Sequence, residues 1–444
     1  MVFRFMSIRI QGRLFSGLVA IVIGFSAQAG GLYIGEFGQP NQGASRAGAN
    51  AIAEDASTAF QNPAGTMFLG ESKSMATAIV IDSKSKFDQS ETFPATASAV
   101  TNAAGDGPAS NGGDAGSTAL GGAYFYANPI NDTWGWSFAF ASISGASLEY
   151  ENGADFAGRY WATKVDLLTI SAAPSISYKV SENLSIAATL GLTFGQLDLD
   201  VAIPGPVDPN GVLPYVKDGL AEISDGDDLA LSVGVSTMWQ ATDETRLGLI
   251  YNSEIELDFD SDLNITPPGG GIGPGQIGAN VEITWPQTLR GSVAHDYSDQ
   301  LTLLASVAWE DWSAFKDVPI TTSTGGGSAL PRNYRDTWHF AVGLRWQEGP
   351  RWTYYTGIAY DTDPTKASDR TADMPLDEQW RYSAGATYER DNGHKIGGVL
   401  TYADYGDADI DNGGVRPGPG GETWTVKGDY STNRIIMLGL NYGW

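Results

Sequence analysis

Cysteine is absent from the 444-residue chain, so disulfide bonds contribute nothing to its stability. Basic residues are scarce: 26 Lys and Arg stand against 52 Asp and Glu, and the formal net charge is −26. Nucleic-acid binding needs clustered Lys and Arg, so this balance argues against a nucleic-acid partner. The same excess of acid favours exposed, well-solvated loops.

Histidine is also rare, and the chain has only His295, His339 and His394. None has the HxxxH or HExxH spacing, so the sequence predicts no metal, no cofactor and no metalloenzyme. A barrel lipase would need a Ser–His pair, but Ser292 lies three residues from His295, and a strand puts such residues on opposite faces. We therefore predict that the protein is not an enzyme, with a lipid hydrolase kept as an alternative. For His339 we expect a structural hydrogen bond.

Two acidic runs invite comparison with calcium loops: Asp407, Asp409, Asp411 and Asn412, and Asp258, Asp260 and Asp262. The first run lacks the glycine at position six and the closing glutamate of an EF-hand loop. A solvated acidic loop is therefore the favoured interpretation for both runs.

Long apolar runs are missing after the N-terminal segment. No later stretch reaches the roughly 18 apolar residues that a membrane helix needs. Residues 1–29 have the three parts of a signal peptide, namely a basic region, a short apolar run and a small-x-small cleavage site: Arg4, Arg9 and Arg13, Leu14 to Phe25, and Ala27-Gln28-Ala29. A membrane anchor is the less favoured alternative, because the run is short and no stop-transfer pattern follows. The mature chain is predicted to start at Gly30.

Alternating segments fill the rest of the chain, which is rich in Gly, Tyr and Trp. In Leu184 to Gln196, large apolar residues occupy one face and small or polar residues the other, which is typical of a strand between lipid and a lumen. Fourteen such segments begin near Ser74, Thr118, Thr133, Val165, Asn183, Asp228, Glu244, Ile277, Gln300, Arg335, Arg351, Glu378, Gly393 and Asn433.

Connection lengths alternate strictly between tight turns and long loops, as in outer-membrane barrels whose two rims face the periplasm and the exterior. Unpaired backbone groups are not tolerated in hydrocarbon, so the sheet must close. We predict an all-β fold, a 14-stranded antiparallel transmembrane β-barrel over residues 73–444 with both termini periplasmic. Tryptophans are expected at both interfaces: Trp134, Trp239, Trp346 and Trp352 on the periplasmic side, and Trp309, Trp312, Trp338 and Trp380 on the outer side.

A Gly- and Ala-rich segment, residues 30–72, precedes the first strand. Fourteen strands leave a lumen wider than side chains fill, so we predict that this segment is a hatch inside it, with a disordered leader as the alternative. Ser45 is expected to cap a small-residue helix through Ala59 that ends before Asn62-Pro63. The last strand ends on Trp444, a terminal aromatic of the kind read by barrel-assembly machinery.

The sequence resembles the FadL/TodX-type transporters of hydrophobic compounds over nearly the whole mature chain. The resemblance rests on the order and spacing of several stretches, among them EFGQPNQGASRAGANAIAEDASTAFQNPAG, NPINDTWGWSFAFASISGASLEY, VDLLTISAAPSISYKVSENLSIAATLGLTFG, ITWPQTLRGSVAHDYSDQLTLLASVAWEDWSAF and WTYYTGIAYDTDPTKASDRTADMPLDEQWRYSAGATY. Asn62, Pro63 and Ala64 stand as the family's NPA motif in the hatch.

This resemblance implies an outer-membrane protein of a Gram-negative bacterium that takes up long-chain fatty acids or other hydrophobic molecules. Ligand is captured by extracellular loops and passes to an inner pocket near the mature N-terminus, which corresponds to Gly30, Gly31 and Leu32. It then leaves sideways beside a kinked third strand, and Gly145 matches the kink, although it could also lie merely at a strand end. Lateral release keeps an acyl chain out of water, which saves roughly 0.8 kcal/mol per CH₂.

A buried fatty-acid carboxylate needs a cationic partner. Arg335 aligns with a basic pocket position of the fatty-acid transporters, and its pairing with Asp336 or another acid is the alternative. The chain departs from the family pattern at Gln196, where those proteins have a second basic residue, so a neutral aromatic hydrocarbon also fits. A structural or adhesive barrel whose acidic loops bind a surface partner is the remaining alternative. The partners expected are the hydrophobic ligand, outer-membrane lipid and the barrel-assembly machinery.

Overall fold

A computed structural model describes residues 35–90, 109–205, 217–273, 275–315, 317–412 and 426–444, and the predicted signal peptide lies outside them. Its strands are β1 (Lys73–Gln89), β2 (Thr118–Pro129), β3 (Trp134–Glu149), β4 (Lys164–Ser181), β5 (Leu184–Ile203), β6 (Gly219–Gln240), β7 (Thr245–Asn252), β8 (Ile255–Thr266), β9 (Gln276–Trp285), β10 (Thr288–Asp296), β11 (Leu301–Glu310), β12 (Asp317–Thr322), β13 (Gly327–Pro331), β14 (Thr337–Glu348), β15 (Trp352–Asp361), β16 (Gln379–Glu389), β17 (Lys395–Asp404), β18 (Ile410–Asn412) and β19 (Val426–Gly443). Short helices are η2 (Pro40–Ala44), α1 (Thr58–Gln61), η3 (Pro63–Phe68), η4 (Gly153–Asp155), η5 (Pro268–Gly270) and η6 (Trp312–Ala314). Among the described helices, none is long and apolar enough to cross a membrane.

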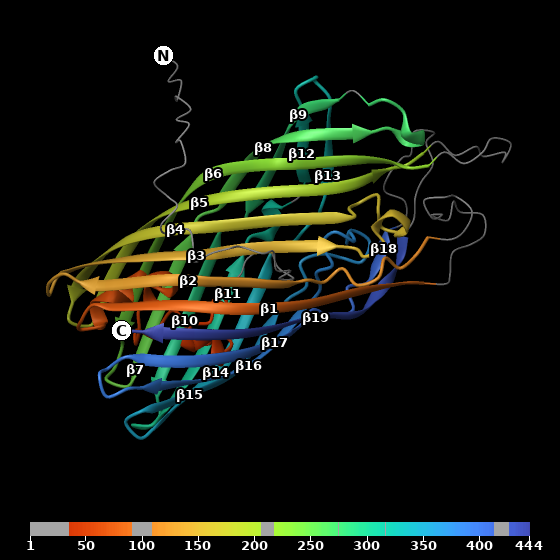
Figure 1. Cartoon of the computed structure of the whole chain (residues 1–444). Helices are drawn as coiled ribbons and strands as arrows, with labels where there is room; N and C mark the ends of the chain where they lie inside the picture. The colour runs from red at the N-terminus through yellow and green to blue at the C-terminus, as the bar shows by residue number, and fades with distance from the viewer. Residues whose placement is uncertain (1–34, 91–108, 206–216, 274, 316, 413–425) are drawn as a thin grey trace, which may run out of the picture.

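The strands form one closed antiparallel sheet (Figure 1). β1 pairs with both β2 and β19, which joins the two ends of the chain and leaves no open edge between them. β7 continues into β8 and β9 into β10, while β12, β13 and β18 are short additions at the loop-bearing rim, so the wall has fourteen strands. The predicted 14-stranded barrel is confirmed.

Several segments predicted to be long loops contain strand. β6 begins at Gly219 rather than near Asp228, β8 runs on to Thr266, and β12 pairs with β13 as a hairpin. The strands of the wall therefore continue beyond the part that faces lipid. The pattern used to predict them, with large apolar residues outside and small or polar residues inside, ends before the strands do.

The physical reason is an inversion of polarity along the strand, which β5 shows. In its first part Leu190 and Phe194 are exposed on the outer face, and Ser185 is buried on the inner face. Farther along, the buried inner residues are apolar and the outer ones acidic: Leu197, Leu199 and Val201 inside, with Asp198 and Asp200 outside. Above the bilayer, the outer face meets water and the interior becomes an apolar core.

The same inversion corrects the interpretation of one acidic run. Asp258 and Asp260 lie in β8, exposed on its outer face, with Leu257 and Phe259 buried between and beside them. They are strand residues rather than loop residues. Their alternation with apolar residues is the sequence signal for a strand that has water outside and an apolar core inside.

A charge on the lipid-facing part of β5 should therefore destabilise the barrel far more than one above the inversion. We expect Leu190→Arg to lower the free energy of unfolding by about 2–4 kcal/mol, the cost of a cation at mid-bilayer depth. Asp198→Arg is the matched control on the same strand and face, and should cost much less. Denaturant unfolding in liposomes measures both, and equal losses would contradict this placement of the membrane.

Tryptophan positions follow the prediction with one correction. At the rim of tight turns, where the C-terminus also lies (Figure 1), four exposed rings stand on the outer face: Trp134, Trp239, Trp346 and Trp352. Trp338 and Trp380 are exposed near the opposite ends of their strands. Trp312 was predicted at the outer interface, but it is buried in η6 and packs on Phe315 and Tyr334. It belongs to the interior, because η6 folds inward after β11.

Candidate functional site

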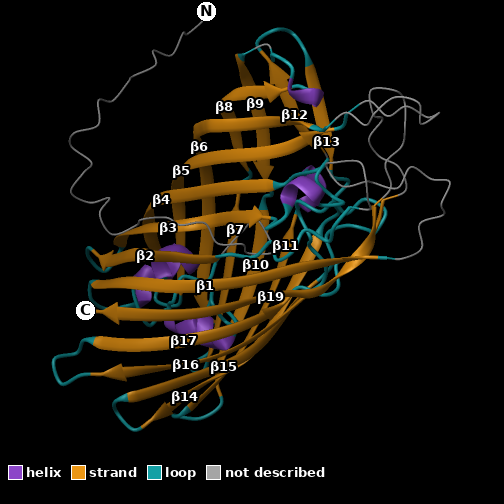
Figure 2. Ribbon diagram, turned by 45° about the vertical axis from the view of Figure 1, so that its right-hand side comes forward, coloured by secondary structure: helices purple, strands orange, loops and turns teal. Residues whose placement is uncertain are grey.

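The hatch residues that the structure describes lie inside the barrel near its short-turn rim, where Figure 2 shows the small helices enclosed by strands. Almost all of residues 35–69 are buried. The predicted helix from Ser45 to Ala59 is wrong: Ser45 has a left-handed backbone (φ 51°) and ends η2, and the α-helix covers only Thr58–Gln61. Its predicted end before Asn62-Pro63 is confirmed.

Glycines let the hatch backbone lie directly against the wall. A Cβ added to Gly357 of β15 would overlap the backbone of Ala44, and one added to Gly439 of β19 would lie 2.5 Å from Cα of Gly38. Asn441 of β19 also donates from Nδ2 to the carbonyl of Gly38 (2.7 Å). Such close approach is available only to glycine, so the small residues of this region serve the docking of the hatch.

Asn62, the first residue of the NPA motif, links the hatch to itself and to the wall. Its Nδ2 donates to the carbonyls of Asn50 (2.6 Å) and of Thr237 in β6 (3.0 Å). Its Oδ1 accepts from the N–H of Ala64 (3.2 Å) and so caps η3. Pro63 follows as the first residue of η3, where its missing N–H costs no hydrogen bond.

The carbonyls of the motif are held by wall hydroxyls. Ser177 of β4 donates to the carbonyl of Pro63 (2.8 Å), and Ser185 of β5 donates to that of Ala64 (2.6 Å). The motif therefore forms a polar seat against three neighbouring strands, which explains why small hydroxyl residues face the lumen there.

Removing the Asn62 side chain should loosen this seat. We expect Asn62→Ala to destabilise hatch docking by about 1–3 kcal/mol, because it leaves buried backbone groups without partners. Hydrogen exchange of the described hatch residues measures the change. Asn183→Ala, in an exposed turn between β4 and β5, is the control and should leave exchange as in the wild type.

A charged cavity lies above η2. Seven ionisable residues, here called the charged ring, line it: Glu36, Arg46, Arg290, Glu310, His339, Asp361 and Arg381. Wall pairs within it are Arg290–Glu310 (3.0 Å), His339 Nδ1–Asp361 (2.8 Å) and Arg381–Asp361. The predicted structural hydrogen bond of His339 is thus present, and Asp361 is its partner.

The hatch contributes one acid of the charged ring. Burial opposes ionisation of Glu36, but Arg46 and Arg381 outweigh it and lower the pKa of its carboxyl. Among the described residues, Nε2 of His339 is buried without a hydrogen-bond partner. The charged ring therefore holds three arginines and His339 together with three carboxylates around one cavity beside the hatch.

An apolar cavity adjoins the hatch on the other side. Hatch residues Phe60 and Pro63 form its floor, and its wall comes from strands β3 to β10, including Ile143, Ile250, Ile255 and Trp285. Phe60 also packs edge-on to Phe37 (centroids 4.9 Å apart). The lining of the cavity is mostly apolar.

Gly145 lies beside a gap in the wall, here called the β2–β3 gap. The β2–β3 ladder runs only from Pro129–Gly135 to Ala123–Ala141, and the next contact is the N–H of Glu149 on the carbonyl of Ala115 (3.3 Å). Between these points β3 pairs with β4 alone, with a bulge between Ser142 and Ser144. The irregularity thus falls just before Gly145, within the strand, so Gly145 is not at a strand end.

The other predicted ligand contacts lie elsewhere. Gly30, Gly31 and Leu32 are outside the described residues. Arg335 precedes β14, its side chain is 52% exposed, and Asp363 is its ion-pair partner (3.0 Å). Arg335 therefore pairs with an acid, as the alternative prediction stated, and that acid is Asp363 rather than Asp336. Gln196 is exposed on the outer face of β5, away from the lumen.

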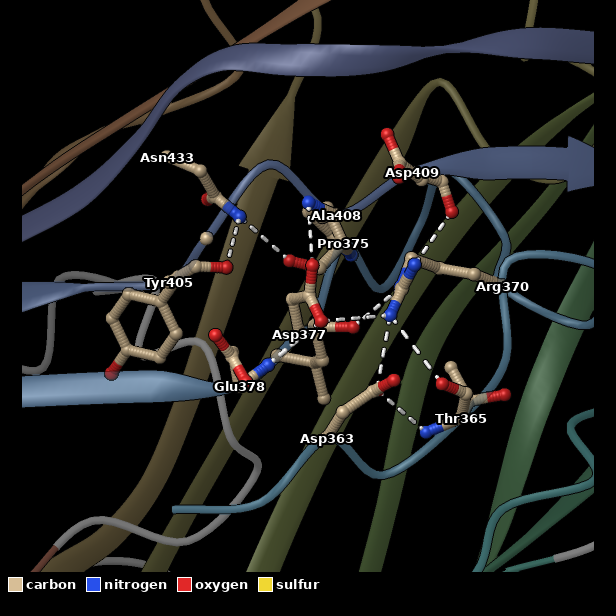
Figure 3. A network of polar contacts seen from close by, with 12 residues as sticks. Asp363, Thr365, Arg370, Pro375, Asp377, Glu378, Tyr405, Ala408, Asp409 and Asn433 are labelled. Atoms are coloured by element: carbon tan, nitrogen blue, oxygen red, sulfur yellow. Dashed lines mark hydrogen bonds and ion pairs between the residues drawn. The ribbon is translucent and has the colours of Figure 1, made fainter. Parts of the chain in front are cut away.

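Sequence reasoning missed the buried arginines of the extracellular loops. Figure 3 shows Arg370 at the centre of a polar network that joins the β15–β16 loop to the segment before β18. It donates to the carbonyls of Leu376 and Asp409 (both 2.6 Å) and pairs with Asp363 (3.0 Å) and Asp377 (3.2 Å). The signal available in the sequence is an arginine flanked by aspartates in a strongly acidic loop.

Two further buried pairs join other loops: Arg332, after β13, pairs with Asp373 in the β15–β16 loop, and Arg159, between β3 and β4, pairs with Asp218 just before β6. Tyr150 and Tyr430 share a hydrogen bond (2.6 Å), and burial raises the pKa of Tyr150 well above 10. Together these contacts tie the loops into a folded cap over the apolar interior.

Ser292 and His295 do not act together. Ser292 hydrogen-bonds Asn50 of the hatch (3.0 Å), whereas Nδ1 of His295 contacts Thr245 (2.9 Å). The structure as described groups no three His, Asp or Glu side chains that could hold a metal ion. The acidic run Asp407, Asp409, Asp411 and Asn412 is partly engaged through its backbone, since the Asp409 carbonyl accepts from Arg370.

Comparison with known proteins agrees with this architecture. The family model described as outer membrane protein transport protein (OMPP1/FadL/TodX) matches residues 20–442. The long-chain fatty acid transport protein of Escherichia coli O6:H1 is 25% identical over 84% of this chain and 87% of its own length. Outer membrane protein P1 of Haemophilus influenzae is 24% identical over 82% of this chain and 83% of its own.

Solved structures show the same fold. A Pseudomonas aeruginosa FadL homologue superposes with a TM-score of 0.83 at 21% identity and covers 93% of this chain and 99% of its own. The toluene transporter TodX of P. putida gives 0.66 at 16% identity, over 90% and 97%. The protein is therefore an outer-membrane transporter of hydrophobic compounds and not an enzyme. This chain belongs to the OMPP1/FadL/TodX family of outer membrane transport proteins.

Proposed function

We propose that the transported compounds are long-chain fatty acids, with the carboxylate at the charged ring and the hydrocarbon in the apolar space. The observation that carries this proposal is the charged ring itself. Arg46, Arg290 and Arg381 face one cavity inside a lumen whose upper half is apolar. A buried carboxylate needs such cations, whereas a neutral hydrocarbon does not.

The path for the chain follows the inverted polarity of the wall. Below the cap, buried residues such as Leu199 and Phe259 line the interior, and the apolar cavity at Phe60 continues this surface down to the hatch. Each CH₂ that stays out of water retains about 0.8 kcal/mol. The docked hatch supports a route that turns sideways rather than through the barrel.

Lateral release at the β2–β3 gap completes the proposed route. The interrupted ladder, the bulge after Ser142 and the position of Gly145 support an opening toward the outer leaflet. In the proposed domain division, residues 1–29 are a signal peptide, 30–72 the hatch and 73–444 the barrel, with Gly30, Gly31 and Leu32 near the bound ligand. Outer-membrane lipid and barrel-assembly machinery, acting on the strand that ends at Trp444, are the proposed further partners.

Uptake measured with two ligands tests this assignment. In a Gram-negative host without its own fatty-acid transporter, the wild type should take up labelled oleate, and Arg381→Gln should reduce that uptake about tenfold by removing a buried charge partner. Arg381→Lys keeps the charge and should retain part of the activity. Arg351→Gln, an exposed arginine in a tight turn, is the control and should behave as the wild type.

Uptake of a neutral aromatic is the second candidate, favoured by Phe60 and Trp285 on the apolar cavity. If toluene is taken up and oleate is not, the fatty-acid proposal is wrong and the aromatic one stands. If Arg381→Gln takes up both ligands as well as the wild type does, the role given to the charged ring is also wrong.

A further inference from the structure

The wall has a second interruption, between β6 and β8, farther along the sheet than the β2–β3 gap and separated from it by β3, β4, β5 and β6. β6 pairs with β7 from Gln240–Arg246 to Gly234–Asn252, and with β8 from Asp227–Asp260 onward. In this part of the described chain no ladder pair joins residues 228–233 of β6 to residues 253–259. We call this interval the β6–β8 window.

Both strands remain fully paired on their other sides. Residues 228–233 of β6 pair with β5, and residues 255–259 of β8 pair with β9. Three hydrogen bonds close the ends of the window. At one end the N–H of Ser253 donates to the carbonyl of Val233 (2.9 Å) and the N–H of Val233 donates to Oγ of Ser253 (3.0 Å); at the other end the N–H of Asp258 donates to a carboxylate oxygen of Asp228 (2.8 Å). Two of the three use a side-chain oxygen where a ladder would use a carbonyl.

A kink in the neighbouring strands accounts for the window. Asn252 and Ile255 both line the cavity although they are three residues apart, and so do Trp285 and Thr288 on the adjoining strand. Side chains on one face of a regular strand recur every two residues, so an extra residue is inserted in each strand here, beside Pro286. Proline has no N–H for a ladder and commonly marks such sites.

The kink carries β8 into the barrel. The side chains of Leu257 and Phe259 pass behind β6 to reach β5, where a Cβ added to Gly195 would lie 2.9 Å from each. β8 has therefore moved inward relative to β6, which leaves the window between them.

The apolar cavity reaches this window. Its lining includes Ser232, Val233 and Ser253 at the window and Phe60 of the hatch inside, and Val233 is a lipid-facing residue that is 57% exposed. Ile143, at the β2–β3 gap, lines the same cavity. One apolar space thus borders both interruptions of the wall.

The window lies at the depth of the outer leaflet. Leu229 and Leu231 on its outer face are exposed, at 63% and 64%, while Asp227 and Asp260 mark the acidic zone directly above. Irregular backbone at membrane depth is tolerated where it lines a cavity and not where it faces lipid alone. The window therefore fits a passage better than a defect.

We propose that the β6–β8 window is a second lateral opening, through which the hydrocarbon part of the transported compound passes between the apolar cavity and the outer leaflet. This inference rests on the proposed function, because it needs a hydrophobic ligand inside the barrel. This route is separate from the one proposed at the β2–β3 gap.

Photolabelling tests the route. The purified full chain in lipid nanodiscs is irradiated with a diazirine-bearing palmitic acid analogue, and labelled residues are mapped by mass spectrometry. We expect label on the inward-facing window residues Ser232 and Ile255 as well as near Phe60. Ser232→Trp, which fills the mouth of the window, should reduce the label on Ile255 at least fivefold and leave the label near Phe60.

Val342→Trp adds the same side chain to the lipid face of β14, whose ladders are continuous on both sides, and is the matched control. Asn252→Phe is a second filling variant if Ser232→Trp does not fold. Label confined to the β2–β3 gap and the hatch, or label at Ile255 that neither variant reduces, overturns the second opening. Absence of competable label throughout the interior would instead count against the proposed function.

Discussion

Replacing Gly357 by valine should drive the hatch from its seat and convert the plugged barrel into a conducting pore. Gly357 lies in β15 with the backbone of Ala44 against it, where a Cβ has no room. Gly343 of β14 meets the carbonyl of Ala44 as well, at 3.0 Å from an added Cβ. Two wall glycines therefore hold this part of the hatch, and backbone cannot yield as a flexible side chain can. Overpacking of this kind costs about 1–3 kcal/mol or more.

Single-channel recording in planar bilayers measures the result. With the hatch displaced, conductance should rise about tenfold or more, because a fourteen-stranded lumen is wider than its side chains fill. Gly291→Val is the matched control, since a Cβ there would lie 3.7 Å from Leu249, an ordinary contact. A Gly357→Val protein that folds and conducts like the wild type would contradict the close docking of the hatch.

Loss of Arg370 should unfold the cap locally while the barrel stays intact. Its guanidinium is almost fully buried and pairs with Asp363 and Asp377, and it also satisfies two backbone carbonyls from different loops (Figure 3). Arg370→Ala leaves both carboxylates without this partner. Breaking a buried pair from one side costs about 3–5 kcal/mol, and here the cost falls on the contact between the β15–β16 loop and the segment before β18.

Limited proteolysis of intact cells measures the cap, and thermal unfolding of the purified protein measures the barrel. We expect rapid cleavage within residues 362–378 in Arg370→Ala, with the unfolding of the barrel nearly unchanged. Arg351→Ala removes an exposed pair with Asp391 at the other rim and should change neither readout. Equal protease resistance of Arg370→Ala and the wild type would show that the loops are held by apolar contacts alone.

The sequence by itself determined the number of strands in the wall, and it predicted a plug in the segment before the first strand. These follow from local patterns: alternation within a strand such as β5, the length of each connection, and a small-residue segment unlike all others. Each pattern can be seen in a short stretch of sequence, because the pleat of a strand repeats every two residues.

Only the tertiary structure decided how the parts meet. The pairs of Arg370, the inward position of Trp312 and the hydrogen bond from Asn441 to Gly38 join residues far apart in the chain, so no local pattern encodes them. The β6–β8 window is likewise invisible in the sequence, because a missing ladder is a property of two strands together. The inversion in β5 follows from where the strand leaves the bilayer. In lipid the apolar residues of the alternation face outward, and in water they face inward.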